Sequence, residues 1–180
     1  MALPARIASC QPAPLTPREP AAAVVMMGYG NPLCGDDGFG PAVVQPLAQR
    51  ILDASVRVHV TRQLTPELAT ELAEARLVIF VDAAVHLAPG ELRFTRLRPA
   101  QPHATPLTHH LAAASLLELC RRLYGRTPRA VVCAAGASAL ELGQGMAPRV
   151  RKAAHRARMR LAALIARRSR RTVHRRFRHA

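Results

Sequence analysis

Aromatic side chains are scarce in this chain of 180 residues, of which they form 3%, and tryptophan is absent. Hydrophobic residues nevertheless account for 49% of the chain. A core must therefore be built mainly from alanine, valine, leucine and isoleucine. A chain of this length supports one domain with one core.

Long apolar segments are also missing, since no apolar run reaches the roughly 20 residues that a membrane helix requires. Residues 1–20 are rich in proline and alanine and contain no continuous apolar region of the kind found in secretory signals. The four cysteines (Cys10, Cys34, Cys120 and Cys133) form no C-x-x-C motif, which argues against a zinc knuckle or a thioredoxin-like site. These absences predict a cytoplasmic protein with reduced thiols and a flexible leader over residues 1–20.

Acidic residues are absent from residues 149–180, which carry 13 of the 26 lysines and arginines. Residues 1–148 therefore hold 13 basic and 11 acidic residues, a net charge of only +2 out of +15. We expect residues 167–180 to be disordered, because Val173 and Phe177 alone cannot offset the entropy of ordering them. A solubilising tail is the simplest role for this segment; capture of an acidic protein surface or of nucleic acid is the alternative.

One glycine-rich stretch, residues 28–40 (GYGNPLCGDDGFG), stands out from the rest of the chain. It follows the short apolar run of residues 21–27, which is typical of a buried parallel strand, and precedes a helical pattern that starts at Pro41. In open α/β sheets ligands bind at the carboxyl ends of the strands. The order strand, loop, helix therefore predicts that Asp36 and Asp37 lie at a binding edge.

The remaining segments alternate between strand and helix patterns. Thr65 is expected to cap a helix that has Pro66 at its first position. The expected strands are residues 56–61 and 90–97 at the sheet edges, 77–81 at the centre and 130–135; the expected helices start near residues 65, 109 and 148. This order predicts a three-layer α/β/α sandwich around a five-stranded, mostly parallel twisted sheet, formed by residues 21–166.

Three side chains are candidates for one site at the sheet edge: Asp37 in the first loop, Asp82 at the end of the central strand and His109 at the start of a helix. Carboxylates and imidazole together suit a divalent metal such as nickel, zinc or manganese, and three protein ligands leave positions open for water or substrate.

Each candidate also has a simpler interpretation. Asp82 taken alone could be a turn residue, and Asp36 or Asp37 could cap the following helix. His109 lies in a histidine-rich region in which His103 and His110 could take its place. The expected convergence of all three side chains is what favours the functional interpretation.

Nucleotide binding is the main alternative use of the glycines. Gly28 and Gly30 match the start of a dinucleotide fingerprint, but Leu33 replaces its third glycine and Pro32 removes a backbone N–H. No Gly-Lys-Ser/Thr sequence follows, and the neighbouring carboxylates would repel a pyrophosphate. We therefore expect no nucleotide cofactor.

Four segments in this order resemble the hydrogenase maturation endopeptidases: residues 28–41 (GYGNPLCGDDGFGP), 63–69 (QLTPELA), 78–83 (VIFVDA) and 109–117 (HHLAAASLL). This resemblance covers about residues 22–166. Some relatives carry Asp-Gly-Gly-Thr where this chain has Arg-Gln-Leu-Thr at residues 62–65, so no role is transferred to that position.

The resemblance implies a phosphorylase/hydrolase-like fold and an endopeptidase that removes the C-terminal extension of a nickel–iron hydrogenase large-subunit precursor after nickel insertion. Asp37, Asp82 and His109 would then contact nickel held by the precursor, with Asp37 and Asp82 also the catalytic carboxylates. Hydrolysis could use a carboxylate as general base or a metal-polarised group. A chaperone that senses nickel without cleaving the precursor is the alternative. We expect a monomer without nucleic-acid partners.

Overall fold

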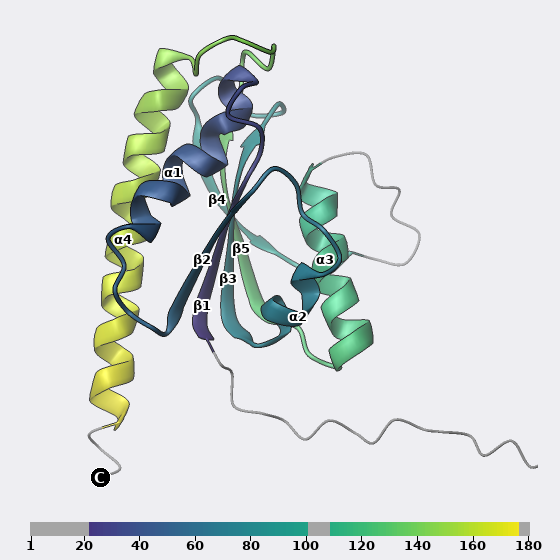
Figure 1. The fold of residues 1–180 in the computed structure, drawn as a ribbon, viewed down its shortest axis with the longest axis vertical. Coiled ribbons are helices and arrows are strands. Elements are labelled where there is room, and N and C mark those ends of the chain that lie inside the picture. The colour runs from purple at the N-terminus through teal and green to yellow at the C-terminus, as the bar shows by residue number, and fades with distance from the viewer. Residues whose placement is uncertain (1–21, 101–108, 177–180) are drawn as a thin grey trace, which may run out of the picture.

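The computed structural model describes residues 22–100 and 109–176, with side chains from 24–100 and 112–168. Five strands form one sheet in the order β2-β1-β3-β5-β4 (Figure 1). Strands β1 (Ala22–Tyr29), β2 (Val56–Thr61), β3 (Ala75–Ala84) and β5 (Arg129–Gly136) are parallel, and β4 (Leu92–Leu97) pairs antiparallel with β5. The predicted five-stranded, mostly parallel sheet is confirmed, with β2 and β4 at its edges.

Helices cover both faces of this sheet (Figure 1). Helices α1 (Phe39–Ala48) and α4 (Pro148–Arg176) lie on one face, and α2 (Leu68–Ala73) and α3 (His109–Tyr124) lie on the other. A short 3-10 helix, η1 (Gly35–Gly38), joins β1 to α1. The three-layer α/β/α architecture is therefore confirmed.

Strand residues alternate between two cores, as the period of a β-strand requires. Met26 of β1 and Ile79 of β3 are buried against α1 and α4, whereas Met27 and Phe80 are buried against α2 and α3. The few aromatic residues include one packed pair, since Tyr29 and Phe80 meet edge to face with their ring centroids 6.4 Å apart.

Glycines allow α1 to start directly against the sheet. A Cβ atom at Gly40 would lie 2.3 Å from the carbonyl oxygen of Tyr29 and 2.5 Å from that of Val81. A Cβ atom at Gly28 would lie 2.5 Å from the carbonyl oxygen of Gly40. These contacts leave no room for a side chain, and they fix the loop after β1 against the ends of β1 and β3.

Several element boundaries differ from the predictions. Strand β3 does not end at Asp82, because residues 82–84 continue to pair with residues 134–136 of β5. Helix α2 has Glu67 rather than Thr65 at its N-cap, because the carbonyl oxygen of Thr65 accepts a hydrogen bond from the N–H of Leu68 in a preceding turn.

Helix α4 does not end near residue 167 but continues to Arg176. Its apolar stripe stops at Ile165, yet no glycine or proline interrupts residues 149–176, and arginine is a strong helix former. The predicted boundary near residue 167 is therefore wrong as the end of this helix. The leader of residues 1–20, together with residues 177–180, lies outside the described part. Within the described segments, no helix combines the length and the apolar character needed to cross a membrane.

Candidate active site

Asp82 lies in the central strand β3 and is fully buried. It is in phase with Phe80 and Ala84, which belong to the core beneath α2 and α3, so its side chain lies on that face of the sheet. One carboxylate oxygen, Oδ1, accepts a hydrogen bond of 2.8 Å from the backbone N–H of Ala83. A carboxylate in such a place needs polar partners, because burial of an unpaired charge is costly.

Tyr29 of the neighbouring strand β1 is one such partner. The parallel register that pairs Gly28 with Val81 brings the next residues of both strands, Tyr29 and Asp82, side by side. Burial raises the pKa of the Tyr29 hydroxyl, and the charge of Asp82 and a hydrogen bond between the two side chains raise it further. Tyr29 is therefore a neutral O–H donor beside the buried carboxylate. Sequence reasoning did not identify this residue, although its place in the buried phase of β1 was a usable signal.

Asp37 lies in η1, directly after the first loop, and is half-buried. Its Oδ2 atom accepts a hydrogen bond of 2.6 Å from the backbone N–H of Asn31. The loop can fold back in this way because Gly30 has a φ of +126°, and a Cβ atom there would lie 2.1 Å from the carbonyl oxygen of Asp37. The carboxylate is thus fixed by the loop itself and keeps partial access to solvent.

Asp36, the other carboxylate of the pair, has a different role. It is fully buried, and its Oδ2 atom accepts hydrogen bonds from the N–H of Ser138 (2.8 Å), the hydroxyl of Ser138 (3.1 Å) and the N–H of Ala139 (3.0 Å). Oδ1 accepts a fourth, of 2.7 Å, from the N–H of Ala147. Asp36 therefore ties the loop between β5 and α4 to the first loop. Nothing in the sequence linked these segments, which are more than 100 positions apart.

The hydrogen-bond partners of Asp36 and Asp37 decide whether these two residues act as helix caps. Burial alone would raise the pKa of Asp36, but the hydrogen bonds from Ser138, Ala147 and Ala139 outweigh it and hold the pKa below its usual value. Neither η1 nor α1 has a side-chain hydrogen bond at its N-cap, so the capping interpretation of Asp36 and Asp37 is wrong.

The structure brings Asp37 and Asp82 to the same edge of the sheet, the one at which the parallel strands have their carboxyl ends. Gly40, three residues after Asp37, packs on the backbone of Val81, which directly precedes Asp82. His109 begins α3, the helix on the face where Asp82 lies. The side chains of His109 and His110, and all of His103, lie outside the described part. Among the side chains that are described, no three of the histidine, cysteine, aspartate and glutamate type gather into a metal site.

Asn31 organises the loop between β1 and η1. Its Oδ1 atom accepts a hydrogen bond from the N–H of Leu33, and its Nδ2 atom donates one of 3.1 Å to the Sγ of Cys34. The described cysteines, Cys34, Cys120 and Cys133, are all free. Burial raises the pKa of Cys120 to about 11 and that of Cys133 to about 12, which leaves both as inert thiols.

Comparison of the whole structure with solved structures identifies its fold. The endopeptidase HybD from E. coli, a hydrogenase-maturating enzyme, superposes with a TM-score of 0.66 at 24% identity over 80% of this chain and 92% of its own. This chain has the fold of the hydrogenase maturation endopeptidases. The fold expectation derived from the glycine-rich loop and the three later segments is thereby confirmed.

Two further structures extend this likeness across organisms. The [NiFe] hydrogenase maturation protease HycI from Thermococcus kodakarensis gives a TM-score of 0.63 at 23% identity, covering 81% of this chain and 91% of its own. The hydrogenase 2 maturation peptidase from a Thaumarchaeota archaeon gives 0.60 at 25% identity, covering 79% and 97%. No family model and no curated protein matches the chain. The maturation-endopeptidase fold therefore rests on structure.

Proposed function

We propose that this chain is an endopeptidase of the cytoplasm that removes the C-terminal extension from a nickel–iron hydrogenase large-subunit precursor. The observation that carries the proposal is the pair of carboxylates, Asp37 and Asp82, held at one edge of the maturation-endopeptidase fold. The shared fold and the names of the neighbouring structures support this function.

In the proposed reaction, Asp37, Asp82 and His109 contact nickel that is already bound in the precursor, so that nickel belongs to the substrate. Carboxylate and imidazole ligands suit this ion. Asp37 is half-buried and can meet an incoming ligand, whereas Asp82 is fully buried. Contact of Asp82 with nickel therefore requires that the residues of this protein that cover Asp82 move when the precursor docks.

Hydrolysis adds water to the carbonyl carbon of the scissile peptide, breaks its C–N bond and leaves a carboxylate and an amine. Two routes could activate the water: a site carboxylate would accept its proton as general base, or nickel of the precursor would lower the pKa of a water bound to it. Asp37 is the better placed carboxylate for the first route because part of it remains exposed.

Peptide release tests this function directly. Nickel-loaded precursor incubated with the full chain should release a short C-terminal peptide that mass spectrometry detects, while nickel-free precursor should stay intact. Asp82→Asn should abolish release. Glu74→Gln makes the same chemical change just before β3, at the opposite edge of the sheet, and should cleave at the wild-type rate.

The same experiment separates the enzyme from the chaperone alternative. Tight binding of nickel-loaded precursor with no peptide released would contradict the endopeptidase function and favour a chaperone. Cleavage of nickel-free precursor would contradict the role of nickel. Wild-type activity in Asp82→Asn would contradict the site assignment alone.

A further inference from the structure

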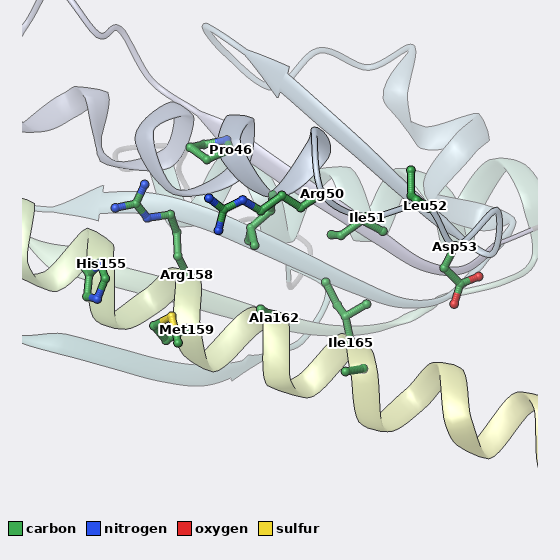
Figure 2. A pocket seen from close by; sticks show the side chains of 12 residues that line it. Pro46, Arg50, Ile51, Leu52, Asp53, His155, Arg158, Met159, Ala162 and Ile165 are labelled. Carbon is green, nitrogen blue, oxygen red and sulfur yellow. The ribbon is translucent and has the colours of Figure 1, made fainter.

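A groove along α4, here called the α4 groove, consists of two adjoining cavities that share His155 and Arg158. The first, of about 830 Å³, lies between the start of α4 and Pro89 and Gly90 of the loop after β3. The second, of about 430 Å³, lies between α4 and the end of α1 (Figure 2).

The first cavity is strongly basic. It is lined by four exposed cations and one half-buried cation from the first turns of α4: Arg149, Arg151, Lys152, Arg156 and Arg158. None of the described residues that line it is acidic. The start of a helix adds partial positive charge of its own, so the cavity favours an anion.

This charge has no acidic partner within the described chain. Arg151 donates to the carbonyl oxygen of Met146 (3.0 Å) and Arg156 to that of Gly90 (2.9 Å), so backbone groups hold both side chains in place. Some arginines elsewhere on the surface do pair with glutamates, as Arg121 does with Glu118. Backbone oxygens therefore position Arg151 and Arg156, and no acidic side chain of the described residues neutralises the five cations of this cavity.

The second cavity is mainly aliphatic. Figure 2 shows residues at the end of α1 and just after it facing Met159, Ala162 and Ile165 of α4. Leu52 and Met159 are 95% and 61% exposed, which leaves a substantial apolar surface open to water. An occupant of the whole groove must offer both negative charge and aliphatic side chains.

A protein segment meets both requirements, whereas nucleic acid meets only one. No phenylalanine, tyrosine or tryptophan lines either cavity among the described residues, so bases would find little stacking surface beyond His155. A lipid surface is also a poor match, because the apolar stripe of α4, which includes Val150, Ala157 and Leu161, is buried against the sheet.

The groove begins beside the candidate site. Gly90 pairs through its N–H with the carbonyl oxygen of Gly136 at the carboxyl end of β5, and α4 follows the loop that Asp36 holds. The stretch of α4 from Arg149 to Ala166 spans about 25 Å. An extended segment of about seven to eight residues would cover that distance.

We propose that the α4 groove binds an acidic segment with aliphatic side chains that belongs to the precursor, and that this contact holds the precursor while its cleavage point lies at the Asp37 and Asp82 edge. This inference rests on the proposed function for the identity of the partner. The groove supplies affinity and orientation, and the carboxylates supply the chemistry.

Processing kinetics of the full chain on nickel-loaded precursor test the proposal. Charge reversal of two exposed cations that hold no backbone group, in Arg149→Glu/Lys152→Glu, should raise KM about tenfold at 0.05 M salt and leave kcat unchanged. The rise should shrink at 0.2 M salt because exposed charges are screened. Arg76→Glu/Arg129→Glu changes the net charge equally at the opposite edge of the sheet and should keep the wild-type KM.

A second pair of variants tests the apolar cavity. Leu52→Ser should raise KM about threefold with no dependence on salt, since it removes apolar contact alone. Leu123→Ser, on the exposed side of α3, should behave as wild type. If both groove variants retain the wild-type KM, the docking proposal is overturned even though cleavage by the wild type continues.

Direct titration keeps the proposal separate from the proposed function. If the wild type cleaves nothing, calorimetry can still measure whether the precursor binds. A loss of affinity in Arg149→Glu/Lys152→Glu would then support the α4 groove as the docking site. A 12-nucleotide single strand, or vesicles of phosphatidylcholine and phosphatidylserine, that bind the groove more tightly than the precursor would overturn the proposal in favour of nucleic acid or membrane.

Discussion

At the carboxyl edge of the sheet, the three carboxylates Asp36, Asp37 and Asp82 each accept hydrogen bonds from the chain itself. At the start of α4, five cations line a cavity in which no described residue is acidic. Internal partners fix the first set in one geometry, which is what a reaction needs. The second set keeps its charge available to an outside partner, which is what recognition needs.

The largest expected effect separates the adjacent residues Asp36 and Asp37. Asp36→Ala leaves three backbone N–H groups and one hydroxyl without their acceptor and should lower the free energy of unfolding by about 4 kcal/mol. Asp37→Ala removes one backbone hydrogen bond at a half-buried place and should cost about 1 kcal/mol. Urea unfolding followed by circular dichroism measures both. Equal losses would show that the two carboxylates do not differ in role.

A slightly smaller loss is expected where α1 meets the sheet. Gly40→Ala places a methyl group on the backbone oxygens of Tyr29 and Val81, and overpacking of this kind should cost about 3 kcal/mol. Gly125→Ala is the matched control: no atom lies within 4 Å of its Cβ, and only its φ of +63° opposes the change, at about 1 kcal/mol. Thermal unfolding compares the two. A fully stable Gly40→Ala would mean that α1 can shift away from the sheet.

Local patterns were sufficient to predict most of the fold. The strand at residues 56–61 alternates apolar and polar side chains and lies at an edge, and the run at 77–81 is uniformly apolar and lies at the centre. Asp37 and Asp82 followed from the same rule, because parallel strands end at one edge.

Contacts between distant segments were not predictable in this way. The hydrogen bonds that Asp36 accepts from Ser138 and Ala147 depend on how two loops meet, and a single sequence carries no signal for that pairing. The extent of α4 beyond Ile165 was missed for a different reason. Burial was used to end the helix, whereas helix propensity continues without interruption to Arg176.

Tyr29→Phe tests whether the hydrogen bond between Tyr29 and Asp82 serves the reaction rather than stability alone. The change removes the O–H beside buried Asp82 and fills nearly the same volume. A hydrogen bond to a charged group is worth about 1.5 kcal/mol. If the reaction depends on that bond, kcat for peptide release should fall about tenfold with KM unchanged. A variant that loses stability but keeps its kcat would assign Tyr29 a structural role only.

The smallest effect near neutral pH concerns carboxylates whose pKa is lowered by folding. Hydrogen bonds from Arg121 and then Arg122 lower the pKa of Glu118 from its ordinary 4.5 to about 2, and that of Asp36 is held below 3.8. Because the unfolded chain binds these protons more readily, the stability that both groups contribute is complete above their ordinary pKa values and is lost as the pH falls through the folded ones. Between pH 7 and 5 these two groups should therefore leave the free energy of unfolding nearly unchanged. Below about pH 4.5 it should fall progressively, and Glu118→Gln or Arg121→Gln should flatten that fall. Urea midpoints at pH 7, 5, 4 and 3 measure the slope, and a slope in Glu118→Gln as steep as in the wild type would show that Glu118 contributes nothing to it.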